Sequence, residues 1–121
     1  MFVRDYLHIT WDGSDIQNDI ATASVHGVAT SPVTGTTPAI TTVPLDTTVL
    51  GNKFMDEITP NGTAQAAFTD DASKTDGLSV ATTGAGTATY KVVFLAFPLE
   101  AYGTAAQKVD LLTRTKNFFG P

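Results

Sequence analysis

The most apolar segment of the chain lies near its end, at residues 89–97, which read Thr-Tyr-Lys-Val-Val-Phe-Leu-Ala-Phe. β-Branched and aromatic side chains follow one another there, without the alternation of polar and apolar residues that marks a half-exposed strand. Continuous apolar runs are typical of strands that are covered on both faces of a sheet. The segment therefore predicts a buried, central strand over residues 90–97.

An amphipathic segment follows, after a short loop with proline and glycine at 98–103. Its apolar residues recur at helical spacings, and we expect them to form one stripe: Val109, Leu112 and Phe119, with Leu111 and Phe118 alongside. Thr104 is a suitable N-cap, and Gly120 before a proline is a suitable stop. The pattern predicts a helix over about 105–119 that covers the sheet.

The earlier part of the chain has a weaker pattern of short apolar stretches separated by turn residues. Prolines interrupt residues 30–44 so densely that we expect a loop there, with at most a short edge strand. Residues 2–9 have the pattern of one or two helical turns. Short strands are predicted in four places: 21–28, 47–50, 63–68 and 78–82.

These elements indicate a single domain over residues 1–121, of the α/β or α+β class. We expect a mixed sheet with a buried central strand at 90–97, a covering helix at about 105–119, and a β- and turn-rich insert at about 20–89. A strand, a short loop and a covering helix form the closing unit of larger α/β domains. Since no regular first half precedes this unit, we interpret the chain as the C-terminal portion of a larger α/β domain.

Composition narrows the classes of partner and chemistry. Hydrophobic residues make up 42% of the chain and charged residues 16%, as in a globular protein. The net charge of −5 disfavours nucleic acid and anionic membranes, because both are bound by clustered Lys and Arg. The absence of cysteine excludes disulfides, thiolate metal sites and a cysteine nucleophile. No apolar run approaches the roughly 20 residues of a membrane helix, and no signal peptide follows Met1, so we expect the chain as given to stay in the cytoplasm.

The first chemical candidate is an acidic, turn-rich segment that carries four oxygen ligands: Asp12, Asp15, Asn18 and Asp19. Carboxylate and amide oxygens a few residues apart, with Gly13 to tighten the turn, can converge on Ca²⁺. The segment departs from the EF-hand loop, in which ligands alternate at every second residue. The same side chains also suit a solvated turn that caps backbone amides. A second acidic turn, at Asp70 and Asp71 with Asp76, has the same two interpretations.

Glu100 is the second chemical candidate. It follows the carboxyl end of the predicted strand 90–97, where open α/β sheets bind their ligands. Paired with Asp12 or Asp15, it would supply the two carboxyl groups, roughly 5–10 Å apart, that glycoside hydrolysis requires. The alternative is that Glu100 orders loop 98–103 by accepting backbone hydrogen bonds. No Gly-x-Ser-x-Gly elbow and no phosphate-binding glycine loop is present.

The imidazole and aromatic side chains have structural and functional interpretations. We expect His8 to pack against apolar neighbours and His26 to lie on the surface of a strand. Four aromatic residues are candidates for a sugar-stacking platform, although core packing explains most of them better: Tyr6, Trp11, Tyr90 and Tyr102.

Three segments together resemble a known kind of domain: residues 2–8, residues 12–19, and residues 91–101 leading into the last helix. They are similar to the C-terminal half of flavodoxin-like or glutamine-amidotransferase-like α/β domains. Such domains are accessory modules of large secreted bacterial peptidases of the immune-inhibitor-A and subtilisin-like types. The chain has no His-Glu-x-x-His zinc motif, and no catalytic residue comes with the resemblance.

The resemblance implies a non-catalytic accessory or structural module related to secreted bacterial hydrolases, extracellular in the parent family. It also implies a sheet edge that must be covered, either in a homo-oligomer or by the remainder of a larger parent chain. Two alternatives remain open. One is a small hydrolase (glycosidase, esterase or peptidase) that uses carboxylates or a bound metal, and the other is a carbohydrate-binding module.

Overall fold

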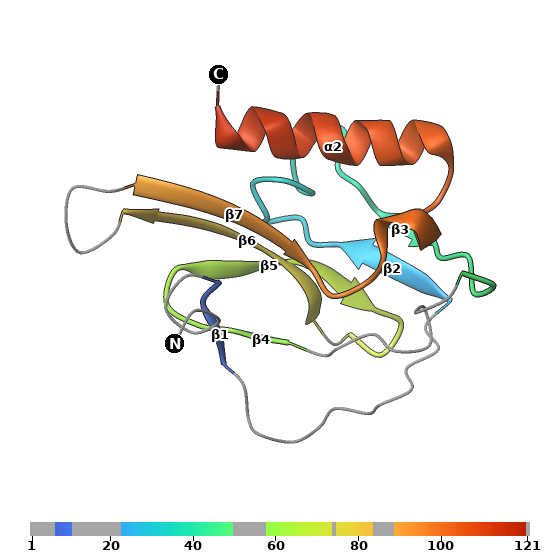
Figure 1. Ribbon diagram of the computed structural model, residues 1–121, viewed down its shortest axis with the longest axis horizontal. Helices are drawn as coiled ribbons and strands as arrows, with labels where there is room; N and C mark the ends of the chain where they lie inside the picture. Colours follow the sequence, from blue (N-terminus) through green and yellow to red (C-terminus); the bar gives the residue numbers. More distant parts are fainter. Residues whose placement is uncertain (1–6, 11–22, 50–57, 74, 84–88, 121) are drawn as a thin grey trace.

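Figure 1 shows the computed structural model, which describes residues 7–10, 23–49, 58–73, 75–83 and 89–120. Five strands form an antiparallel sheet in the order β3-β2-β5-β6-β7, and the short strands β1 and β4 pair separately. The C-terminal helix α2 lies over the five-stranded sheet. The elements in chain order are β1 Ile9–Thr10, β2 Ser24–Gly27, β3 Thr42–Pro44, β4 Thr59–Pro60, β5 Ala64–Asp70, β6 Thr75–Thr83, β7 Thr89–Leu95, the 3₁₀ helix η1 Leu99–Ala101, and α2 Ala105–Phe119.

The sheet is covered on both faces at β7. On one face, Leu111 of α2 belongs to the larger core cluster, against which Val93 of β7 packs. On the other face, Val92 and Phe94 pack against a smaller cluster that contains Ile9 of β1. Successive residues of a strand point to opposite faces, so β7 contributes to both layers. An apolar residue is therefore favoured at nearly every position of this strand.

Three aromatic rings form the centre of the larger cluster. The ring of Phe68 meets those of Phe97 and Tyr102 edge to face, with centroids 5.3 and 5.7 Å away. The rings of Phe97 and Tyr102 stack at 6.0 Å. All three residues are at most 4% exposed, and such ring pairs add about 0.5–1.5 kcal/mol each beyond the burial of their area. The cluster ties β5 to the segment between β7 and α2.

Antiparallel strands with one C-terminal covering helix confirm the predicted α/β or α+β class, in its α+β form. Within the part of the chain that the structure describes, the predicted central position of strand 90–97 is wrong, and no pair of strands there is parallel, as a mixed sheet would require. Among the described strands, β7 is the last in the order, and its neighbour β6 runs antiparallel to it. The apolar run indicates that side chains on both faces of β7 are covered. It does not indicate whether strands lie on one or on both edges of β7.

The helix begins and ends where the sequence predicts. Thr104 caps it in a reciprocal capping box with Gln107, and Gly120 ends it with a positive φ of 92°. The predicted apolar stripe, however, faces the wrong way. Leu111 is the buried residue of α2, whereas Val109, Leu112 and Phe119 are exposed.

The short strands are predicted with mixed success. The strands expected at 21–28, 63–68 and 78–82 correspond to β2, β5 and β6. The strand expected at 47–50 is wrong, because the carboxylate of Asp46 accepts hydrogen bonds from the backbone and the hydroxyl of Thr48 and forms a turn. Strand β3 lies just before it, within the proline-rich segment, at the edge of the sheet where proline is tolerated. The helical turns expected at 2–9 lie outside the described residues up to position 6, and Ile9 belongs to a strand.

Candidate functional site

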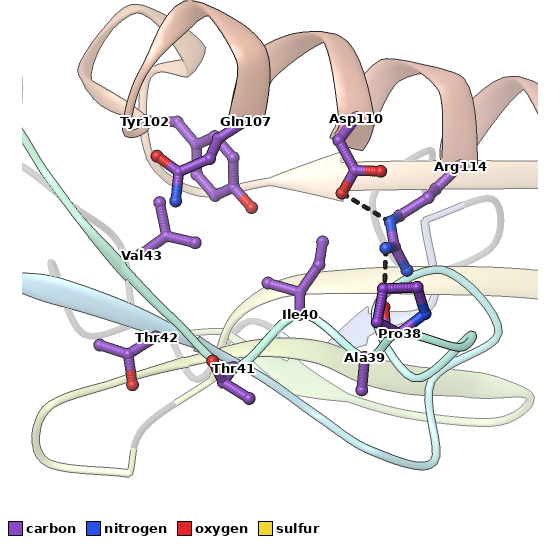
Figure 2. A pocket seen from close by; sticks show the side chains of 10 residues that line it. All are labelled: Pro38, Ala39, Ile40, Thr41, Thr42, Val43, Tyr102, Gln107, Asp110 and Arg114. Carbon is purple, nitrogen blue, oxygen red and sulfur yellow. Dashed lines mark hydrogen bonds and ion pairs between the residues drawn. The ribbon is translucent and has the colours of Figure 1, made fainter.

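A shallow pocket lies between α2 and the segment that leads into β3 (Figure 2). Its volume is about 230 Å³. Ile40 and Val43 supply apolar surface, and the phenol of Tyr102 directs its hydroxyl toward the middle of the pocket. Asp110 and Arg114 of α2 line one side. The pocket therefore combines a carboxylate, a guanidinium and a phenol above an apolar floor.

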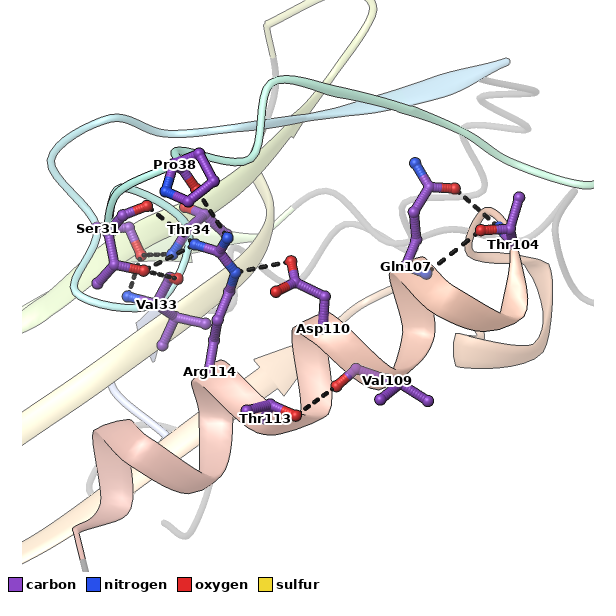
Figure 3. A network of polar contacts seen from close by, with 11 residues as sticks. Ser31, Val33, Thr34, Pro38, Thr104, Gln107, Val109, Asp110, Thr113 and Arg114 are labelled. Carbon is purple, nitrogen blue, oxygen red and sulfur yellow. Dashed lines mark hydrogen bonds and ion pairs between the residues drawn. The ribbon is translucent and has the colours of Figure 1, made fainter.

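The guanidinium of Arg114 is used to hold the fold together (Figure 3). It donates to the carboxylate of Asp110 at 2.8 Å, to the carbonyl and hydroxyl oxygens of Thr36 at 2.9 and 2.7 Å, and to the carbonyl oxygen of Pro38 at 2.7 Å. Its side chain is only 12% exposed. These bonds clamp the segment between β2 and β3 onto α2. The cation is thus committed to this segment and is not offered to a ligand.

Tyr102 is fully inside the protein, with 1% of its surface exposed. Burial, the largest cause, together with the nearby charge of Asp110 raises the pKa of its phenol to about 12, and the charge of Arg114 partly opposes both. The hydroxyl therefore stays protonated near neutral pH. It can donate a hydrogen bond into the pocket, but it is unsuited to act as a base.

A hydroxyl, an imidazole and a carboxylate lie in line on the surface near β2 and β3. The Nδ1 atom of His26 is 3.0 Å from the hydroxyl of Thr42, and its Nε2 atom is 2.8 Å from the carboxylate of Asp71. The other oxygen of Asp71 accepts hydrogen bonds from the backbone N–H groups of Ala23 and Ser24. This order of groups is that of a hydrolytic triad. Thr42 and Asp71 lie 16 and 45 residues from His26 in the chain, so sequence spacing alone could not reveal this arrangement.

The position of Thr42, His26 and Asp71 favours a structural role for these side chains. His26 and Thr42 are direct cross-strand neighbours, as expected of a residue on a strand surface. The side chains of His26 and Asp71 are 37% and 45% exposed, so water reaches both. Asp70, in the same turn, accepts a hydrogen bond from the backbone of Ala72 at 2.8 Å. For Asp70 and Asp71, the interpretation of this acidic turn as a cap for backbone amides is confirmed, whereas the side chain of Asp76 lies outside what the structure describes.

The structure describes only some of the predicted site residues. Asp12, Asp15, Asn18 and Asp19 lie outside the described residues, so the calcium site and the pairing of Asp12 or Asp15 with Glu100 stay predictions. Glu100 lies in η1 and is exposed, and its carbonyl oxygen accepts a hydrogen bond from Lys108 at 2.7 Å. Of the four aromatic candidates, Tyr102 belongs to the core, Tyr90 lies 2.9 Å from the imidazole of His8, and the other two are outside the described residues.

An exposed apolar row runs along α2, and we call Val109, Leu112 and Phe119 the outer stripe. These side chains are 63%, 52% and 48% exposed. Successive helical residues are about 100° apart around the axis, so Leu112 lies on the flank opposite Asp110, with the buried Leu111 between them. The flank of Asp110 faces the segment before β3, at the other end of the strand order from β7. The flank of Leu112 therefore faces the outer edge of β7.

Comparisons of the chain with protein-family models, with curated proteins and with solved structures find no match. Within the described residues, no group of three or more His, Asp or Glu side chains is close enough to hold a metal ion. The same residues contain no helix with the length and apolar character needed to cross a membrane. The functional argument is carried by the geometry of this chain.

Proposed function

We propose that this chain is a non-catalytic accessory module that acts by associating with another polypeptide. The observation that carries the proposal is the outer stripe of α2, which lies beside the terminal strand of the sheet. The resemblance of the final strand, loop and helix to accessory domains of secreted bacterial peptidases supports the same role. On that resemblance, the proposed place of action is extracellular, next to a hydrolase.

The outer stripe has the properties of an interface. Its three side chains extend over eleven residues of helix, about 15 Å, and each keeps roughly half or more of its surface in water. Single exposed apolar residues are normal on protein surfaces, whereas three large ones on one side of a single helix indicate a binding surface. Leu111 and Phe118 already attach α2 to the core cluster. The outer stripe is therefore additional to what the fold needs.

Strand β7 adds a second kind of binding surface. Its register with β6 is unbroken over seven residue pairs, from Thr89 to Leu95. Natural edge strands are usually blunted by charged side chains, especially lysine, by proline or by a bulge. Between Tyr90 and Leu95 there is no proline or bulge, and the single charge, on Lys91, is held by the carbonyl oxygen of Phe118. The strand is thus suited to pair with another strand.

Site-directed photo-cross-linking tests the association. A benzophenone amino acid replaces Leu112 in the chain within the organism that encodes it, and a control chain carries it at Asn117, which is exposed on the Asp110 flank of α2. We expect a cross-linked polypeptide from position 112 and none from position 117. Equal yields from both positions, or no product from position 112, would overturn the proposed role.

A second assay tests the absence of catalysis. The purified chain is offered ester, glycoside and peptide substrates, and we expect no turnover above the rate in buffer. Turnover that disappears in Glu100→Gln or in Asp15→Asn would replace this proposal with the carboxylate hydrolase. Turnover that disappears in Thr42→Ala would instead assign activity to the line of Thr42, His26 and Asp71.

A further inference from the structure

We infer that the polypeptide bound by β7 and the outer stripe is a second copy of this chain, joined β7 to β7 about a two-fold axis. The inference rests on the association proposed above and names its partner. In the resulting dimer, the two five-stranded sheets continue into one another. The two α2 helices lie on the same face of the joined sheet, with their outer stripes turned toward each other.

The first argument is what β7 lacks. Both of its faces are already covered, by α2 through the larger cluster and by β1 through the smaller one. Among the described strands it has one neighbour, β6. A further strand satisfies the backbone N–H and C=O groups on the outer side of an edge strand without disturbing either face. The partner is therefore expected to supply a strand, and β7 of a second copy has the right length and the same apolar character.

The second argument is symmetry. The outer stripe lies on the same face of the sheet as α2, so covering it requires both helices on that face. A two-fold axis perpendicular to the sheet achieves this, because it leaves every residue on its own face. Residues directly opposite each other must then share a face, so the axis has to pass midway between the two copies of one residue, which we call an axis through that residue. An axis through Val92 pairs the full length of β7, Thr89–Leu95, with its symmetry mate.

The third argument is the set of cross-strand neighbours that this axis creates. Tyr90 comes to lie opposite Phe94 of the second copy, an aromatic pair of the kind that stabilises antiparallel sheets. Lys91 lies opposite Val93 of the second copy. An axis through Lys91 would instead place two ammonium groups directly opposite each other, which is unfavourable. The sequence of β7 is therefore self-complementary about Val92.

The fourth argument is size. The helix α2 has 15 residues and is about 22 Å long, which is close to the length of a seven-residue strand. Three layers meet at this edge: α2, the sheet, and the pair of β1 with β4. At about 10 Å per layer, the edge presents roughly 650 Å² per copy, close to the ~800 Å² per partner of a standard stable interface.

Sedimentation velocity over a series of concentrations tests the dimer. We expect the purified chain to dimerise, and Leu112→Asp and Phe119→Asp each to weaken dimerisation at least tenfold. Asn117→Asp is the matched control, because it places the same charge on an exposed position of the Asp110 flank, and it should leave dimerisation unchanged. Circular dichroism verifies that each variant is folded. A monomer at 100 μM, or a dimer that persists in both stripe variants, would overturn the inference.

Disulfide trapping tests the register. The chain has no cysteine, so Val92→Cys carries a single thiol. Opposite residues of antiparallel strands have Cα atoms about 4.5–5.5 Å apart, within the range of a disulfide. We expect oxidation to link Val92→Cys into a covalent dimer, and to leave Lys91→Cys and the exposed Gln65→Cys on β5 as monomers. Linkage of Lys91→Cys with none of Val92→Cys would refute the axis through Val92.

The two levels of the proposal fail differently. If the purified chain is monomeric but position 112 cross-links to a different polypeptide, the association remains and the second copy is excluded. If position 112 cross-links to nothing and the chain is monomeric, both fail.

Discussion

Gly27 shows how closely the backbone of β2 approaches its neighbour. A Cβ atom added there would lie 2.3 Å from the carbonyl oxygen of Ile40, which is far inside van der Waals contact. The N–H group of Gly27 also donates to the carbonyl oxygen of Thr41 at 2.7 Å, so the two segments cannot separate without losing a hydrogen bond. Glycine suits position 27 because the backbone of Ile40 occupies the space that a side chain would need.

We expect Gly27→Ala to lower the free energy of unfolding by about 1–3 kcal/mol or more, because the segment around Ile40 must move away. Urea denaturation measures the effect. Thr41→Ala, an exposed change one residue along, should stay within about 0.5 kcal/mol of the parent. Equal stability of Gly27→Ala and the parent would contradict the close approach.

Tyr102 makes stability depend on pH in the alkaline range. Its pKa is raised to about 12 in the folded protein, above the ordinary value near 10 that applies when the chain is unfolded. The folded state therefore holds this proton more tightly, and the resulting stabilisation is complete below pH 10 and is lost as pH rises toward 12. We expect the midpoint of urea unfolding to fall over this range. Tyr102→Phe should flatten the decline, and Tyr90→Phe should keep it; a decline that is unchanged in Tyr102→Phe would assign it to other groups.

At the scale of elements, α2 is positioned by one flank and leaves the other flank exposed. Arg114 attaches it to the segment between β2 and β3, and Leu111 attaches it to the core. A guanidinium can reach several acceptors in one plane, which an ammonium group cannot. The clamp therefore depends on arginine specifically.

We expect Arg114→Met to reduce the free energy of unfolding by about 2 kcal/mol, because the carbonyl oxygens of Thr36 and Pro38 lose charged donors. Arg114→Lys should recover only part of this. Lys116→Met, on an exposed residue of the same helix, is the control and should be nearly neutral. Denaturant unfolding of the three variants checks the order, and a neutral Arg114→Met would show that the clamp adds nothing to stability.

At the scale of the whole molecule, the calcium hypothesis for Asp12, Asp15, Asn18 and Asp19 predicts a change in thermal stability. A bound ion stabilises the folded state by mass action. Chelator should then lower the melting temperature, added Ca²⁺ should restore it, and Asp15→Asn should abolish the response. A melting temperature that is the same with and without chelator would eliminate the calcium site and favour the solvated turn.

Local patterns predicted much of the fold. The bounds of α2 follow from groups within a few residues of one another, namely the side chains of Thr104 and Gln107 at the start and Gly120 at the end. The strand at 90–97 follows from its apolar run, because side chains on both of its faces pack, partly buried, against apolar clusters. The capping role of Asp70 and Asp71 could also be predicted, because acidic residues in a turn accept hydrogen bonds from nearby backbone amides.

The candidate site was much less predictable. The partners of His26 and of Arg114 lie up to 45 and 78 residues away, where no spacing rule applies. The outer stripe was seen as a pattern, but five apolar residues on α2 cover two adjacent faces, and either face could have met the sheet. Glu100 was favoured by an expectation for parallel α/β sheets, and the antiparallel pairing of β7 with β6 removes that argument.

The elements whose causes are local could be predicted from the amino-acid sequence: the capped helix at about 105–119, the apolar strand before it, and the turns between short strands. The tertiary structure decided which face of α2 is buried, that β7 ends the order of described strands, and that Arg114 serves as a clamp. The physical reason is range. Hydrogen bonds between near neighbours are encoded in a few adjacent residues, whereas the choice between two apolar faces depends on the shape of everything that packs against them.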